Sequence, residues 1–397
     1  MDSFRCIHAA RLLLDHQLHG HQSSVAGQLA PDVRKIVEDA TLMAFEQIVE
    51  QALTHDVHCV LISGDSFEPE DRGLRGPAAL VRGIQRLAER DIPVILHAGR
   101  PELWSSWPTG LRFPLNAHRL GAGLAPSASI TREGKLLATI AVDDPAQLPS
   151  AHLPAGPRGW QIHLPTAHLP GTSATAGTIH LHGDWKPAQG LRADESGPHG
   201  FTLIEIDATG TPRQTFVPAA PARWEHFPID VSAETSRDDL LQDMASQLEQ
   251  TQRHDCEKVW LVAWDVTGAG ALFELLANPT FRVQLLEELA GLDPAPGVRI
   301  HTHALRMHPA VPPSRPIADS ESGVEKNLAA EFAMRLEERF ADPKRAIDEC
   351  LAGSALAGGP WEVKIESLFA ELDAGEVAHD ARRLAMHWFA GQEELSS

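Results

Sequence analysis

The first hundred residues alternate short apolar runs with stretches of helical spacing, and this alternation restricts the fold more than any other feature. The apolar runs are continuous, which is typical of strands covered on both faces of a sheet. The order strand, helix, strand, helix, strand predicts a parallel sheet with helices packed against it. The expected strands lie at 4–10, 57–63 and 93–97, and the expected helices at 31–54 and 77–89.

Functional groups in such folds gather just beyond the carboxyl ends of the strands. In this sequence those places are residues 11–15, 64–65 and 99–102. These three segments are therefore the first candidates for a functional site.

Charge and composition change along the chain of 397 residues. The whole chain carries 34 Lys and Arg against 54 Asp and Glu, while residues 226–397 alone hold 15 basic and 30 acidic residues. The change predicts two domains, 1–225 and 226–397, of which the second is an acidic α/β domain. Because DNA-binding surfaces are usually basic, the net charge of −20 argues against DNA binding through the chain's own surface.

Further elements are expected beyond the first hundred residues. The strands expected in the first domain lie at 136–142, 161–164, 179–182, 201–206 and 213–217. The second domain is expected to hold strands at 258–264 and 297–303, with helices at 236–251, 270–290, 321–340, 344–353, 361–372 and 377–391.

The cysteines and the hydropathy pattern indicate the compartment. Cys6, Cys59, Cys256 and Cys350 are far apart and form no Cys-x-x-Cys pair. Such spacing predicts buried thiols in a reducing compartment rather than disulfides or a zinc site. No stretch approaches 18 apolar residues, and the first residues lack the apolar core of a signal peptide. We expect a cytoplasmic protein with no membrane partner.

The three strand-end segments resemble motifs of the calcineurin-like metallophosphoesterases. Residues 8–15 read His-Ala-Ala-Arg-Leu-Leu-Leu-Asp, where that family has His-Thr-Ala-Asp-Leu-His-Leu-Asp. Residues 61–67 read Leu-Ile-Ser-Gly-Asp-Ser-Phe, which is similar to the family's strand followed by Gly-Asp-x-Phe. Residues 92–102 read Ile-Pro-Val-Ile-Leu-His-Ala-Gly-Arg-Pro-Glu, which resembles Ile-Pro-Val followed by Gly-Asn-His-Asp.

Within that family the chain looks most like the SbcD/YhaO type, the nuclease subunits that work with SbcC-like coiled-coil ATPases in DNA double-strand-break repair. Residues 187–190 and 195–203 are similar to the Pro-Gln-Gly and Glu-Thr-Gly-Pro-Lys-Gly stretches of the YhaO type. The resemblance covers about 1–225 and, faintly, the rest. It implies an α/β fold in which a calcineurin-like β-sandwich is flanked by helices, with a smaller C-terminal α/β domain that caps the site or binds a partner.

The family's chemistry is two-metal phosphodiester hydrolysis, and most of its metal ligands are substituted here. Position by position, Arg11 stands for the first Asp and Leu13 for the first His. Arg100 stands for the Asn, and Pro101 for the His that follows it, whereas Asp65 is retained. By this resemblance the vestigial site comprises Arg11, Leu13, Asp15, Asp65, Arg100, Pro101 and Glu102.

The last ligand motif of the family, Gly-His-x-His, has two interpretations here. His180 and His182 keep the His-x-His spacing, and residues two apart on a strand point to one face. The preceding segment is shorter than the family's, so the motif is either retained or deleted, in which case these histidines belong to the following strand. If it is retained, Asp65, His180 and His182 are the candidate metal ligands.

The two substituted arginines carry a hypothesis of their own. A guanidinium group at a ligand position repels a cation because arginine does not lose its proton. One alternative is that Arg11 and Arg100 are solvated surface residues. The other is that they turn inward, replace the missing metal charge and pair with Asp65, Glu102 or Asp15.

Two functional hypotheses follow. The favoured one is an SbcD/YhaO-like nuclease homologue that has lost two-metal activity and serves as a structural or regulatory subunit of an SbcC-like ATPase. We then expect no cofactor and only indirect or weak contact with DNA, and a homodimer is possible. The alternative is an active metal-dependent phosphoesterase or DNA exonuclease that uses manganese or another divalent metal on Asp65, His180 and His182 with further ligands.

Overall fold

A computed structural model divides the chain into two compact units, residues 1–308 and 309–397. The structure describes only part of the chain, almost all of it in the first unit. The described residues are 3–19, 29–68, 73–97, 107, 110–121, 124–143, 159–165, 171–175, 178–182, 186–209 and 211–309. The helices expected between 321 and 391 lie outside these ranges.

A six-stranded sheet forms the centre of the first unit, in the order β11-β10-β1-β2-β3-β4. Strands β1 to β4 run parallel, and β10 and β11 continue the sheet antiparallel beside β1. The strands are β1 (Phe4–Ala10), β2 (Cys59–Ser63), β3 (Val94–His97), β4 (Ala117–Leu120), β10 (Gly200–Ile206) and β11 (Pro212–Pro218). The three parallel strands expected from the apolar runs are therefore confirmed.

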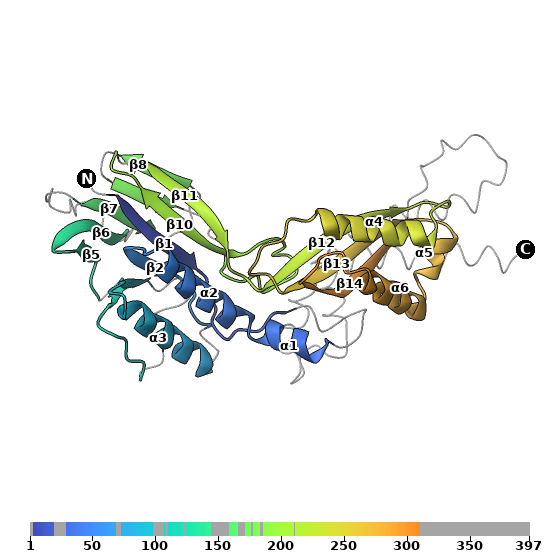
Figure 1. The fold of residues 1–397 in the computed structure, drawn as a ribbon, viewed down its shortest axis with the longest axis horizontal. Coiled ribbons are helices and arrows are strands. Elements are labelled where there is room, and N and C mark those ends of the chain that lie inside the picture. Colours follow the sequence, from blue (N-terminus) through green and yellow to red (C-terminus); the bar gives the residue numbers. More distant parts are fainter. Residues whose placement is uncertain are drawn as a thin grey trace, which may run out of the picture. The chain divides into compact units, whose positions relative to one another are not determined.

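Helices α2 (Ala40–Thr54) and α3 (Arg75–Ala88) pack on one face of this sheet (Figure 1). Their apolar residues form one buried cluster with Ile7, Val60 and Val94 of the strands. The prediction of a single helix over 31–54 is wrong in one respect. The chain forms two helices there, α1 (Pro31–Glu38) and α2, with Asp39 between them.

A second, five-stranded sheet contributes to a core on the other face. Its order is β5-β6-β7-β9-β8, and its strands are β5 (Ser127–Arg132), β6 (Lys135–Asp143), β7 (Trp160–Pro165), β8 (Gly171–Thr175) and β9 (Thr178–His182). Ile130 and Ile140 of this sheet share a buried cluster with Cys6 and Leu61 of the first. The mixed α/β architecture is thus observed, while its assignment to the calcineurin-like sandwich stays a prediction.

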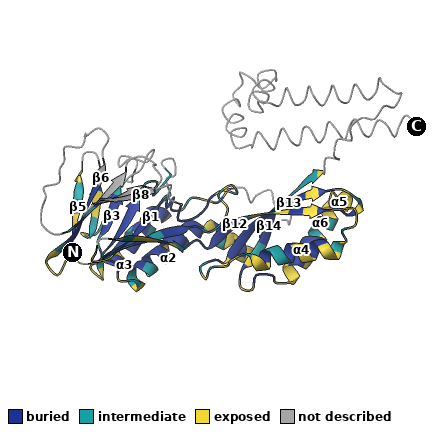
Figure 2. Cartoon of the chain, turned by 90° about the horizontal axis from the view of Figure 1, so that it is seen from above, coloured by how far each residue is buried: buried dark blue, intermediate teal, exposed yellow. Residues whose placement is uncertain are grey.

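A three-stranded sheet, β12-β13-β14, follows in the chain. It consists of β12 (Ala222–Val231), β13 (Val259–Gly268) and β14 (Arg299–Pro309), and it is packed by α4 (Arg237–Gln250), α5 (Ala271–Leu275) and α6 (Pro279–Gly291). Figure 2 shows the buried strands of both regions in dark blue and the exposed faces of the helices in yellow. The predicted domain boundary at 225 falls inside β12, and the division into 1–225 and 226–397 stays a prediction.

Sequence patterns missed four strands. β4, β5, β8 and β12 lack a continuous apolar run, since polar side chains or glycine interrupt each of them. These strands form because neighbouring strands supply hydrogen-bond partners, and the local sequence pattern does not show which strands become neighbours.

The thiol and membrane expectations can be compared with the described residues. Cys6 and Cys59 are buried free thiols on neighbouring strands, and burial raises the pKa of Cys59. Cys256 is a free thiol of intermediate exposure. In the part of the chain that the structure describes, no helix is both long and apolar enough to cross a bilayer.

Candidate functional site

The segments that follow β1 and β2 meet at one edge of the six-stranded sheet. The backbone N–H of Arg11 donates to the carbonyl of Gly64 over 3.3 Å, and that of Leu13 donates to the carbonyl of Asp65 over 2.9 Å. The N–H of Gly64 in turn donates to the carbonyl of His97, at the end of β3, over 2.8 Å. The strand ends predicted from the sequence are therefore tied together as a single loop cluster.

This cluster has an unusual backbone. Arg11, Leu13, Asp15 and Asp65 have φ angles of 48°, 41°, 68° and 44°, although none is glycine. The left-handed region costs an ordinary residue about 1–2 kcal/mol, so hydrogen bonds and packing must hold these four residues there. Backbone strain of this kind concentrates at functional sites.

Arg11 turns toward the chain segment that precedes β10. Its Nη2 lies 3.3 Å from Oε1 of Glu195, and the two side chains are 37% and 20% exposed. The second carboxylate oxygen of Glu195 accepts the N–H of Leu191 over 2.7 Å. Glu195 therefore joins the end of β1 to the loop before β10.

This pairing corrects the hypothesis about Arg11. The carboxylates expected as its partners were Asp65, Glu102 and Asp15, but among the described residues Arg11 pairs with Glu195. Asp15 instead lies 3.2 Å from Arg75 of α3, and its N–H donates to the Thr41 hydroxyl over 3.0 Å. Local sequence could not indicate a partner 184 positions away, although Glu195 stands in the Glu-Ser-Gly-Pro-His-Gly stretch that resembles the YhaO type.

Leu13 is buried rather than turned to solvent. It is 9% exposed and belongs to an apolar cluster that includes Trp224 of β12 and Leu261 of β13. The residues on either side of it, Leu12 and Leu14, pack in the separate cluster beneath α2 and α3. The residue that the resemblance aligns with a metal-binding histidine is thus part of an apolar core.

A buried polar group lies beside these loops and was not recognised in the sequence. Nε2 of His8 is 2.5 Å from the hydroxyl of Ser63, and His97 stands next to Ser63 in the sheet register. Burial, and secondarily the charge of His97, lowers the pKa of His8 to about 3, and burial lowers the pKa of His97. His8 is therefore neutral at physiological pH. The signal available in the sequence was a histidine inside an apolar strand.

The chain is similar in sequence to a metallophosphoesterase. No family model matches the chain. Over 135 residues it is 26% identical to the "Uncharacterized metallophosphoesterase YhaO" of Bacillus subtilis (strain 168). The aligned residues make up 34% of this chain and 32% of that protein. The match thus spans about a third of the relative's length. The similarity supports a relationship to the metallophosphoesterases. A solved structure that aligns with 54% of this chain has a TM-score of 0.28 and 7% identity, too distant to carry an argument.

Two of the positions that the resemblance assigns to metal ligands carry side chains that cannot bind a metal ion. Arg11 brings a fixed positive charge, and Leu13 has no lone pair to donate. Among the side chains that the structure describes, no three His, Cys, Asp or Glu residues lie together in a way that could hold a metal ion.

The other candidate ligands are only partly placed. Arg100, Pro101 and Glu102 lie outside the described residues. His180 and His182 are in β9, where His180 stands in register with His163 of β7 and Ser173 of β8, but their side chains lie outside the description. Their proximity to Asp65 stays a prediction.

Proposed function

We propose that this chain is a metallophosphoesterase homologue of the SbcD/YhaO type that has lost two-metal hydrolysis. It would act as a structural or regulatory subunit with an SbcC-like coiled-coil ATPase. The observation that carries the proposal is the ion pair between Arg11 and Glu195 at the end of β1. Arg11 has a carboxylate partner within the protein, so its charge is balanced without a bound substrate.

The repulsion between Arg11 and a metal ion has a definite size. At 4 Å and an effective dielectric constant of 20, a guanidinium repels each unit of metal charge by about 4 kcal/mol. A divalent ion would therefore lose about 8 kcal/mol of binding energy beside Arg11. Glu195 carries the opposite charge 3.3 Å from Nη2 of Arg11, so it offsets part of this repulsion.

The partner is inferred from resemblance and charge. The SbcD/YhaO type works with coiled-coil ATPases, and this chain keeps its acidic residues mainly in 226–397, which carry twice as many acidic as basic residues. An acidic surface suits a basic protein partner. DNA contacts would then come through that partner.

Nuclease activity tests the loss of catalysis. The purified full chain is incubated with manganese and linear single- or double-stranded DNA, beside variants Asp65→Ala and Asp194→Ala. Asp194 is an exposed carboxylate, so its removal matches the charge change. We expect no manganese-dependent cleavage from any of the three proteins. Cleavage by the parent and by Asp194→Ala that disappears in Asp65→Ala would establish the active phosphoesterase instead.

Co-expression tests the partner. The chain and an SbcC-like ATPase from the same organism are expressed together, and the chain is purified by its tag. We expect the ATPase to elute with it in a stoichiometric ratio. Elution of the chain alone would overturn the subunit role, while the loss of the metal site would still stand on Arg11 and Leu13.

A further inference from the structure

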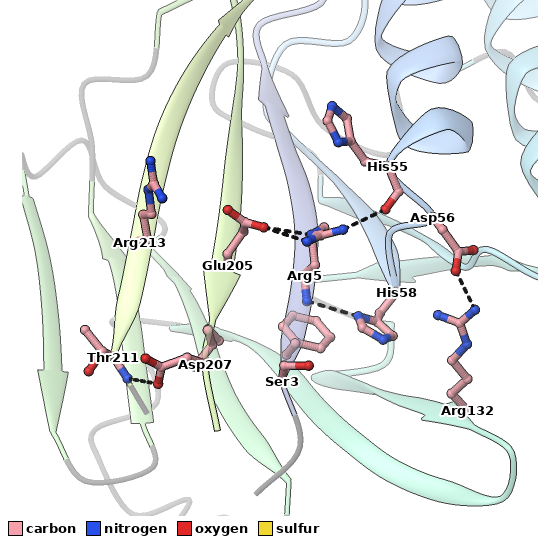
Figure 3. Close-up of a pocket in the computed structure, with 12 residues that line it drawn as sticks. Ser3, Arg5, His55, Asp56, His58, Arg132, Glu205, Asp207, Thr211 and Arg213 are labelled. Carbon is pink, nitrogen blue, oxygen red and sulfur yellow. Dashed lines mark hydrogen bonds and ion pairs between the residues drawn. The ribbon is translucent and has the colours of Figure 1, made fainter. Parts of the chain in front are cut away.

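A cavity of about 600 Å³ lies at the amino-terminal end of β1, opposite the candidate site. Its walls come from the start of β1, the turn between α2 and β2, the β5–β6 hairpin and the β10–β11 hairpin (Figure 3). Arg5 in its wall and Arg11 at the candidate site are six residues apart on an extended strand, about 20 Å. The cavity is therefore a separate site.

A row of three charged residues crosses the cavity wall on neighbouring strands. Arg5 stands opposite Glu205, and Glu205 stands opposite Arg213. Nε and Nη2 of Arg5 contact one carboxylate oxygen of Glu205 at 2.9 and 2.8 Å. Nη1 of Arg5 donates to the carbonyl of His55. Arg213 has no ion-pair partner among the described residues, and Figure 3 shows its guanidinium apart from the Arg5–Glu205 pair.

The other two carboxylates in the wall are also occupied. Asp56 pairs with Arg132 at 2.8 Å, and the hydrogen bond from Arg132 is the first cause that lowers the pKa of Asp56. Asp207 accepts the backbone N–H groups of Thr209 and Thr211 at 2.9 and 3.0 Å. Each carboxylate that lines the cavity among the described residues is therefore engaged by a donor of the protein itself.

The groups that remain are donors. Nδ1 of His58 accepts the N–H of Arg5 over 3.0 Å, so the ring proton resides on Nε2. The ring is fixed by stacking on Phe4, and burial lowers the pKa of His58, which keeps it a neutral N–H donor. Arg213 and His58 thus present hydrogen-bond donors from two sides of one cavity.

We propose that this cavity binds a small phosphorylated molecule, whose phosphate is held by Arg213 and whose organic part accepts a hydrogen bond from His58. Its volume lies within the roughly 300–1,000 Å³ of small-molecule sites, which exceeds the size of a bare phosphate and leaves room for an organic part. Arginine presents a fork of N–H groups that matches phosphate oxygens. The strand register places Arg213 and His58 three strands apart, about 14 Å, which suits a molecule with a phosphate at one end and a hydrogen-bond acceptor at the other. Binding here is independent of the proposed function.

Calorimetric titration of the full chain tests this binding, with inorganic pyrophosphate, AMP and ribose 5-phosphate as probes. Adenosine and ribose are the unphosphorylated controls. We expect saturable one-to-one binding of at least one phosphorylated probe and none of the controls. Binding that saturates with pyrophosphate as strongly as with the two esters would show that the phosphate alone is recognised, which still supports the site.

Variants at position 213 locate the site. Arg213→Ala should weaken binding about tenfold, the loss of one charge-assisted hydrogen bond. Arg213→Lys keeps the charge but loses the fork of N–H groups, so its affinity should lie between those of the parent chain and Arg213→Ala. Arg34→Ala removes another exposed arginine, on α1 and outside the cavity, and should change nothing. No saturable binding by any phosphorylated probe, or equal losses in Arg213→Ala and Arg34→Ala, would overturn the proposal.

Discussion

The pairing of Arg11 with Glu195 allows a graded prediction about stability. Arg11→Ala removes a partly exposed ion pair, a contribution of about 0.5–1 kcal/mol to the free energy of unfolding. Glu195→Ala removes the same pair and also the acceptor of the Leu191 N–H, a bond to a charged group that contributes about 1.5–3 kcal/mol. The loss for Glu195→Ala should therefore be about 2–4 kcal/mol.

Two further variants separate these contributions. Glu195→Gln keeps an oxygen for the Leu191 N–H but removes the charge from both interactions, so its cost should fall between those of Arg11→Ala and Glu195→Ala. The double variant Arg11→Ala/Glu195→Ala completes a cycle whose coupling energy should be about 0.5–1 kcal/mol. Arg192→Ala is the matched control, because Arg192 pairs with Asp194 at the surface with 68% and 65% of the side chains exposed.

The measurement is urea-induced unfolding of the full chain, in which midpoints are compared at unchanged slope. The predicted order of destabilisation is Glu195→Ala, then Glu195→Gln, then Arg11→Ala, then Arg192→Ala. If Arg11→Ala proved as harmless as Arg192→Ala and the coupling energy vanished, the ion pair would not balance the charge of Arg11. Glu195 could then not explain how the protein accommodates this arginine without a metal.

Three other predictions concern buried groups. The folded-state pKa of His8, about 3, lies below its unfolded value near 6.5, so the unfolded state binds more protons between these values. The free energy of unfolding should fall by about 1.4 kcal/mol for each pH unit below 6.5. In His8→Gln this contribution is absent, so the unfolding midpoint should change less between pH 7 and pH 5 than it does in the parent chain. Gly83→Ala places a methyl group 2.5 Å from a ring carbon on α2 and should cost about 1–3 kcal/mol in urea unfolding, whereas Gly291→Ala meets no atom within 4 Å and should be neutral or stabilising. Arg223→Ala leaves the carboxylate of Glu257, whose side chain is 2% exposed, without its cation. This variant should lower the free energy of unfolding by about 3–5 kcal/mol. A loss below about 1 kcal/mol would contradict the ion pair seen at 3.0 Å.

Features that depend on local pattern could be predicted from the sequence. Continuous apolar runs located β1, β2 and β3, and the strand-end rule correctly predicted that residues 11–15 and 64–65 lie together. Alternation of strand and helix was sufficient for this because each run is buried on both faces.

Features that depend on distant contacts could not be predicted in this way. The partner of Arg11 is 184 residues away, and the partner of Asp15, which lies in the loop after β1, is Arg75 of α3. Strand β12 has a partly polar pattern because His226 and Asp230 interrupt it, yet it forms a ten-residue parallel ladder with β13. The cavity at the other end of β1 assembles from four segments that no motif connects.

The loop after β1 shows how packing can offset a strained backbone. Leu12 and Leu14 enter the cluster under α2 and α3, while Leu13 enters the cluster that contains Trp224 and residues of β13. Leu13 thus enters a different core from its two neighbours, and the chain around it has φ angles of 48° at Arg11 and 41° at Leu13. Burial of a leucine contributes about 1.5–3 kcal/mol, which matches or exceeds the roughly 1–2 kcal/mol cost of each left-handed residue. Burial of Leu13 in this second core therefore offsets the strain of the loop, which joins the core beneath α2 and α3 to the core that contains Trp224.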